Sequence, residues 1–329
     1  MAKKNSDKIL TYLIIILSIA GVVYFGLSAI RSDNKRVQNN PFEYDIEEYE
    51  KSGTDLLSYE EIATIPLQLD QPHALAVDEN DRIYVTTGSN LVVYDAAGNQ
   101  IAEGSANSAI SALDVDANGH VYLALNETVE VLDSSLTRAA LWPSLGERAV
   151  LTSIAVDESN VYLADAGQRI IWRFDKTGLL LNRIGERDDT RDIPGFVIPS
   201  PYFDVAVDSD GYLWAVNTGR HQFENYMPDG SLRGSWSKSS MSVDGFSGCC
   251  NPVHIALLTD GSFVTSEKGI LRIKIHNPVG ELSDVVALPD QFSSDTEAVE
   301  VAVNSREQIL LLDPQRKQIR IFQKKDITS

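Results

Sequence analysis

The sequence predicts an all-β protein, a six-bladed β-propeller preceded by one N-terminal transmembrane helix, and three observations support the propeller. First, one pattern recurs six times between residues 72 and 323: an apolar strand ending near Asp, a turn, a second strand with an aromatic residue, then a third strand. Second, the units are 38 to 51 residues apart, a spacing typical of propeller blades. Third, apolar and polar residues alternate with period two, and no convincing amphipathic helix follows residue 31.

The six units align on the last apolar residue before the first turn, which is Val77, Val115, Val156, Val207, Leu257 and Val303. Turn sequences such as DANGH and DSDGY follow these positions and indicate short antiparallel strands joined by tight turns. Closing such units into a ring leaves few exposed sheet edges. Because the last unit has only three clear strands, we expect residues 59–67 to supply its fourth strand and to close the ring.

Three stretches show the repeat most clearly: PHALAVDENDRIYV from Pro72, IAVDESNVYLADAGQRIIWRFDKTG from Ile154 and VAVDSDGYLWAVNTGRHQFENYMPDG from Val205. The pattern covers about 250 residues and resembles that of the NHL-repeat family. The resemblance implies a propeller used as a binding platform or, in a minority of cases, as an enzyme. It identifies the fold more specifically than the function.

The N-terminal region predicts a membrane anchor. Residues 9–30 contain no charged side chain and are long enough to span a bilayer. We therefore expect a cytoplasmic segment over residues 1–8, a signal anchor over residues 9–31, an acidic tether over residues 32–57 and the propeller over residues 58–329. The alternative is a signal peptide cleaved near Ser28 or Ala29. Either interpretation places the propeller outside the cytoplasm, in the periplasm or on the cell surface.

Composition excludes several functions. The formal net charge of −19 argues against nucleic acid and against docking on anionic lipid. The sequence has no nucleotide-binding loop, no GxSxG, no HExxH and no CxxC, which argues against the enzyme classes that depend on these motifs. We expect a membrane-tethered scaffold that binds a protein partner or a small ligand at the propeller mouth. The alternative is a metal-dependent hydrolase or lyase.

The start of the innermost strand of each blade provides the first group of candidate site residues. Three residues before the alignment position, blades four, five and six carry Asp204, His254 and Glu300, and His73 lies near the same level in blade one. An imidazole with two carboxylates could bind a divalent metal such as zinc or manganese, or act in acid–base chemistry. It could equally bind channel water. Pro72-His73 is similar to the PH dipeptide of NHL-type amidating lyases, whose zinc ligands recur in this dipeptide on three blades. Only one blade has it here.

Polar residues after the second strand of each blade form a second candidate group. The group contains Thr87, Asp165, Asn217, Glu267 and Asp313, with Leu125 in the remaining blade. Resemblance to lactonase-like propellers implies calcium at such positions, whereas the physical alternative is capping of turns. Nearby Arg220, His221 and Lys268 could contact an anionic ligand or pair with carboxylates such as Glu224 and Glu267.

Two long insertions precede the inner strands of blades four and five and are expected to cover the mouth. The second insertion ends in the only cysteines of the chain, Cys249 and Cys250. Neighbouring Cα atoms are about 3.8 Å apart, which is shorter than the separation in most disulfides. The pair could form a vicinal disulfide, stay as two thiols or bind a metal. A redox role for the pair is a further alternative function.

Overall fold

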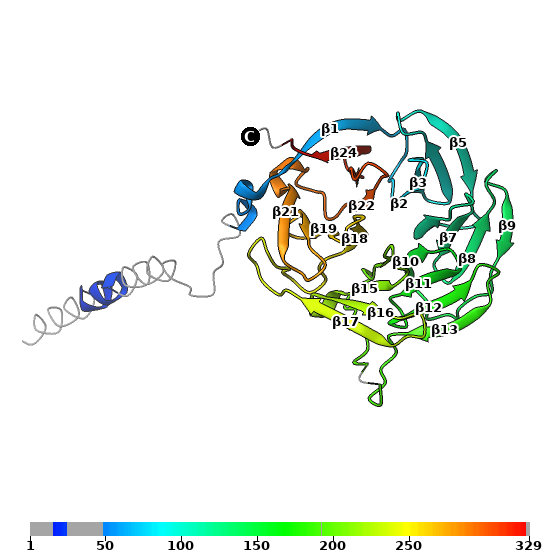
Figure 1. Cartoon of the computed structure of the whole chain (residues 1–329). Coiled ribbons are helices and arrows are strands. Elements are labelled where there is room, and N and C mark those ends of the chain that lie inside the picture. The colour runs from blue at the N-terminus through cyan, green and yellow to red at the C-terminus, as the bar shows by residue number, and fades with distance from the viewer. Residues whose placement is uncertain (1–15, 25–48, 192, 327–329) are drawn as a thin grey trace, which may run out of the picture. The chain divides into compact units, whose positions relative to one another are not determined.

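The computed structural model describes residues 16–24, 49–191 and 193–326. The chain separates into two units, residues 1–46 and 47–329. The larger unit is a six-bladed β-propeller: six four-stranded antiparallel sheets surround a central channel (Figure 1). The predicted all-β, six-bladed fold is therefore confirmed.

In the smaller unit, the described residues 16–24 are helical. No helix among the residues that the structure describes is long and apolar enough to cross a membrane. Most of the anchor predicted over residues 9–31 lies outside the described residues.

Each blade runs from an innermost first strand to an outermost fourth strand, in chain order for the first five blades. Blade one contains β2 (Leu75–Val77), β3 (Ile83–Thr87), β4 (Asn90–Tyr94) and β5 (Gln100–Ser105). Blade two contains β6 (Ala112–Val115), β7 (Val121–Leu125), β8 (Thr128–Leu132) and β9 (Arg138–Leu141). Blade three contains β10 (Leu151–Val156), β11 (Asn160–Asp165), β12 (Ile170–Asp175) and β13 (Leu180–Ile184).

The remaining blades follow the same plan. Blade four contains β14 (Val205–Val207), β15 (Leu213–Asn217), β16 (Gln222–Tyr226) and β17 (Leu232–Ser237). Blade five contains β18 (His254–Leu257), β19 (Phe263–Ser266), β20 (Ile273–His276) and β21 (Leu282–Ala287). Blade six contains β22 (Glu300–Val303), β23 (Ile309–Asp313), β24 (Gln318–Lys324) and, as its outermost strand, β1 (Tyr59–Pro66).

The ring closes as the sequence predicts. Strand β1 pairs antiparallel with β24, from Tyr59 opposite Lys324 to Pro66 opposite Gln318. Tyr59 packs into the core between blades five and six, and Ile65 packs between blades six and one. An N-terminal segment thus completes the C-terminal blade, and the edge of β24 is covered.

Repeated aspartates explain why the chain turns where it does. The Asp78 carboxylate accepts hydrogen bonds from the backbone N–H groups of Asn80 and Arg82, at 3.0 and 2.9 Å. Asp116 and Asp208 make the same pair of bonds in blades two and four. Such turns satisfy backbone groups locally, so the motif sets the register of each first hairpin.

The core lies between blades rather than inside one sheet. Each large apolar cluster joins residues of two neighbouring blades, as in the cluster that packs Tyr122 of blade two against Leu163 and Trp172 of blade three. Between blades four and five, the rings of Phe223 and Trp236 of blade four both pack against Phe263 of blade five, with centroids 4.9 and 5.4 Å from its ring. This packing fixes the angle between blades and therefore the positions of the inner strands.

The segment before β1 packs against blade five. The backbone N–H of Ser58 donates to the carbonyl of Val285 in β21, at 3.2 Å. Gly53 lies so close to Val243 that an added Cβ would come within 2.7 Å of its side chain. The last residues of the predicted tether, from Tyr49 on, are therefore part of the larger unit.

Candidate functional site at the channel mouth

The inner strands of all six blades line a channel cavity of about 320 Å³. At the end where these strands begin, the channel opens into a mouth cavity of about 560 Å³. His73, Tyr202, His254 and Glu300 line this mouth, together with Asp295 and Glu297 from the loop between β21 and β22. The residues of the second candidate group, which follow the second strand of each blade, do not line this cavity.

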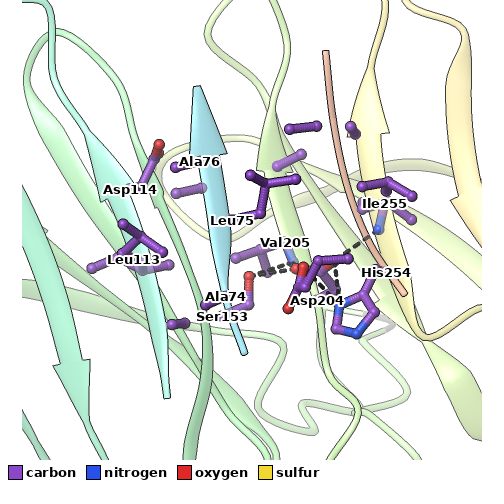
Figure 2. Close-up of a pocket in the computed structure, with 18 of the residues that line it drawn as sticks. Ala74, Leu75, Ala76, Leu113, Asp114, Ser153, Asp204, Val205, His254 and Ile255 are labelled. Atoms are coloured by element: carbon purple, nitrogen blue, oxygen red, sulfur yellow. Dashed lines mark hydrogen bonds and ion pairs between the residues drawn. The ribbon is translucent and has the colours of Figure 1, made fainter. Parts of the chain in front are cut away.

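Three of the predicted site residues meet at one point. The Nδ1 atom of His254 lies 3.2 Å from Oε2 of Glu300 and 3.8 Å from Oδ2 of Asp204. All three side chains come from the first residue of an inner strand or the residue just before it, on blades four to six. Figure 2 shows Asp204 and His254 side by side in the channel.

Asp204 also connects three blades. Its carboxylate accepts hydrogen bonds from the hydroxyl of Ser153 at 2.5 Å, from the N–H of Val205 at 2.9 Å and from the N–H of Ile255 at 2.8 Å (Figure 2). Asp114 makes a similar connection between blades two and three. Asp204 therefore fixes the cluster in place, while His254 and Glu300 face the mouth.

Burial and the charges of neighbouring groups bring the pKa values of His254 and Glu300 close to neutral pH. Burial disfavours the charged imidazole of His254, but the charges of Glu300 and Asp204 outweigh it and raise its pKa to about 8. Burial raises the pKa of Glu300 to about 7, although the charge of His254 works against this rise. Two coupled groups that titrate near pH 7 can exchange a proton with a ligand.

His73 lines the same mouth without joining the cluster. Burial of its imidazole and the positive charge of His254 lower its pKa. His73 is therefore neutral near pH 7, and it can accept or donate a hydrogen bond to a ligand.

The geometry offers no metal centre among the described residues. No three His, Cys, Asp or Glu side chains in that part of the chain are arranged to hold one metal ion. The two carboxylates approach the same imidazole nitrogen, which fits a protonated imidazole better than a shared metal. The zinc or manganese site at Asp204, His254 and Glu300 stays a prediction.

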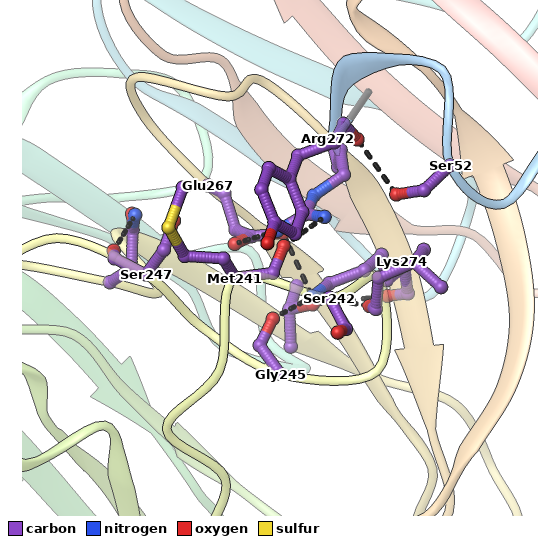
Figure 3. Close-up of polar contacts among 12 residues, drawn as sticks. Ser52, Met241, Ser242, Gly245, Ser247, Glu267, Arg272 and Lys274 are labelled. Atoms are coloured by element: carbon purple, nitrogen blue, oxygen red, sulfur yellow. Dashed lines mark hydrogen bonds and ion pairs between the residues drawn. The ribbon is translucent and has the colours of Figure 1, made fainter. Parts of the chain in front are cut away.

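The second candidate group makes protein contacts. Asn217 accepts a bond from the N–H of Val197 and donates one to Glu224, both at 2.8 Å. Glu267 is fully buried, and its carboxylate pairs with Arg272 and Lys274 (Figure 3). These bonds use the oxygens that calcium would need and agree with the structural interpretation of the group.

Of the two interpretations of Arg220, His221 and Lys268, pairing with Glu224 or Glu267 is not found among the described residues. Glu267 takes its partners from its own hairpin, because Arg272, just before β20, and Lys274, within β20, lie beside it. Glu224 accepts from Asn217 and from Tyr226.

The basic residues have other positions. Arg220 ends the short helix η2 (Thr218–Arg220). Burial and Glu224 raise the pKa of Tyr226, and the positive charge of Arg220 opposes this rise. His221 donates from Nε2 to the carbonyl of Gly248 at 2.6 Å and so holds the second insertion. The ammonium of Lys268 lies 4.4 Å from the centre of the Tyr202 ring.

The insertions cover the mouth only in part. Pro201 and Tyr202 from the first insertion line the cavity, but Cys249 and Cys250 do not. Phe246 is instead buried in the core between blades four and five. Sequence reasoning also missed Asp295 and Glu297. Their only signal is an acidic stretch, SSDTEAVE, directly before the last inner strand.

Comparison with known proteins shows the fold alone. No family model and no curated protein sequence matches this chain. A streptogramin B lyase structure superposes with a TM-score of 0.59 at 11% identity, covering 81% of this chain and 98% of the other. Virginiamycin B lyase from Staphylococcus aureus gives 0.59 at 11% identity, covering 81% and 100%. A protein of unknown function from Bacteroides thetaiotaomicron gives 0.59 at 13% identity, covering 84% and 74%. The chain is thus similar to these propellers in architecture.

Proposed function

We propose that the protein is an NHL-type binding propeller whose mouth takes a small, positively charged ligand such as an amine. The observation that carries this proposal is the charge of the cavity lining. Three carboxylates, Asp295, Glu297 and Glu300, line the mouth, and the described lining residues include no lysine or arginine. A concave acidic site on a rigid scaffold concentrates cations.

The cluster gives this site a defined anchor. The ammonium group of a ligand would donate hydrogen bonds to Glu300, in the place where the imidazolium of His254 now lies. The ring of Tyr202, with its centroid 6.2 Å from that of His254, provides an apolar wall beside the anchor. Charge-assisted bonds in a partly buried cavity are stronger than the same bonds in water.

Ligand binding is expected to depend on pH with a definite sign. Raising the pH through about 7 and then about 8 removes the proton of Glu300 and the charge of His254, so the site becomes more negative. Below these pKa values, the affinity for a cation should therefore rise by up to about tenfold per pH unit for each proton that the site must release. Calorimetric titration with methylammonium and with spermidine between pH 6 and pH 9 measures this effect.

Variants locate the binding. Glu300→Gln should remove most of the cation affinity and the part of its pH dependence that comes from Glu300, whereas Glu103→Gln, on the exposed outer strand β5, should leave both unchanged. Acetate serves as the anionic control. Binding of acetate as strong as that of the cations, or cation binding that ignores pH, would contradict the proposal.

We place the propeller outside the cytoplasm, anchored through residues 9–31. The support is the uncharged apolar stretch from residue 9 to residue 30. In this arrangement the mouth and rim are also available to a protein partner. Resistance of the full-length protein to alkaline extraction from membranes tests the anchor.

A second candidate function is acid–base catalysis of a lyase or hydrolase type. It is favoured by the pKa values of Glu300 and His254, which suit a general base and a general acid near neutral pH. Two neighbours in fold are lyases by name. That likeness supports the candidate only at the level of the scaffold.

Elemental analysis separates a metal enzyme from a binding propeller. We expect no stoichiometric zinc, manganese or calcium in the purified protein or in His254→Ala, because the imidazole already lies against two carboxylates. One metal ion per chain that is lost in His254→Ala, with the fold unchanged by circular dichroism, would instead favour the metal-dependent enzyme.

A further inference from the structure

The second insertion, between β17 and β18, carries a pair of thiols that differ in access. Both cysteines are free; Cys249 is exposed, whereas Cys250 is only 1% exposed. Their sulfur atoms lie 3.0 Å apart. A reagent from solvent therefore meets Cys249 first, and Cys250 is within reach of the Cys249 sulfur.

Bonds on both sides hold the thiol pair in place. His221 anchors the carbonyl of Gly248. On the other side, the Asn251 amide donates to the carbonyls of Ser247 and Lys268, at 2.7 and 3.0 Å, and accepts from the N–H of Lys268 at 2.9 Å. The loop is thus fixed to blades four and five, so the two sulfur atoms are held close to each other.

The surroundings keep the two thiols chemically distinct. Burial and the neighbouring thiol of Cys249 raise the pKa of Cys250, while the Ser200 hydroxyl and the charge of Lys268 act in the opposite direction. Cys250 therefore carries its proton at neutral pH. Attack on an external electrophile falls to the accessible thiol, Cys249.

We propose that Cys249 and Cys250 form a redox site that accepts oxidising equivalents from an external disulfide. The Cys249 thiolate attacks one sulfur of that disulfide, breaks its S–S bond and releases one thiolate, leaving a mixed disulfide on Cys249. Cys250 then loses its proton to solvent and attacks the Sγ atom of Cys249. This step forms the Cys249–Cys250 bond and releases the second thiolate. The protein loses two electrons and two protons, and the external disulfide becomes two thiols.

Oxidised glutathione provides the test, applied to the full-length protein in detergent. In the wild type we expect both thiols to disappear together, the mass to fall by two hydrogens and no glutathione to remain attached. Cys250→Ser should trap glutathione on Cys249. Cys249→Ser should react at least about tenfold more slowly than the wild type, because its remaining thiol is buried.

Three results would overturn the proposal: a lasting glutathione adduct on the wild type, covalent dimers in place of the internal bond, or unchanged thiols after prolonged oxidation. Equal rates for the two single variants would also contradict it. The wild-type mass decides the matter by itself if either variant fails to fold. The ligand titration at the mouth is a separate experiment, since neither cysteine lines that cavity.

Discussion

Replacing Glu267 with alanine is expected to lower the free energy of unfolding by about 3 to 5 kcal/mol. The Glu267 carboxylate is fully buried and makes two 3.0 Å bonds to the guanidinium of Arg272 and a 2.8 Å contact with the ammonium of Lys274. Both cations are themselves fully buried (Figure 3). Without Glu267, the backbone carbonyls of the second insertion would be left to balance two buried charges. Denaturant unfolding followed by tryptophan fluorescence measures the change.

An exposed ion pair is the matched control. The side chains of Arg187 and Asp189 pair at 3.0 Å but are 73% and 79% exposed. Asp189→Ala should therefore change the unfolding free energy by less than about 1 kcal/mol. Equal losses for Glu267→Ala and Asp189→Ala would show that the buried network contributes no more than a surface pair. Glu267→Gln keeps the shape of the side chain and separates lost charge from lost packing.

Much of the fold could be predicted from the sequence because its determinants are local. Alternation of apolar and polar residues specifies strands, and the aspartates at Asp78, Asp116 and Asp208 specify the turns between them. The missing fourth strand of the last blade could be assigned to residues 59–67 by counting strands. These local rules apply to each blade separately, so a wrong strand or turn prediction in one blade does not affect the prediction for the next.

The site could be predicted only where blade equivalence applies. Asp204, His254 and Glu300 start neighbouring inner strands, and radial symmetry brings equivalent positions together. Asp295 and Glu297 reach the mouth from the loop between β21 and β22. The loops at the equivalent place in the other blades differ from it in length and sequence, so symmetry does not locate these two residues.

The long insertions were harder still. The distance in sequence from Cys250 to His254 does not fix the direction in which the insertion leaves the sheet. The second insertion is expected to cover the mouth, but its thiol pair does not line that cavity. The partners of Glu267 were readable in principle, because SEKGILRIK is a tight hairpin that brings Arg272 and Lys274 back toward Glu267.

Removing the closing strand is expected to have the largest effect of all on the propeller. A fragment of residues 68–329 lacks β1, and so loses seven paired positions on β24 together with the buried side chains of Tyr59, Ile65 and Leu67. Complete burial of one such side chain contributes about 1.5 to 3 kcal/mol. The loss should therefore exceed about 4 kcal/mol, and the uncovered edge of β24 should pair between molecules. Unfolding and light scattering, compared with a fragment of residues 58–329, measure both effects.

Adding the strand back distinguishes closure from a general effect of truncation. A peptide of residues 58–67 supplied to the fragment of residues 68–329 should restore the monomer and most of the lost stability, because β1 is joined to blade six by hydrogen bonds and packing alone. The same peptide with Ile65→Asp should fail, since Ile65 is 4% exposed in the closed ring. A fragment of residues 68–329 that is as stable and monomeric as the longer one would refute the role of β1. Rescue by the first peptide and not by the second would show that β1 closes the ring through burial of its apolar side chains.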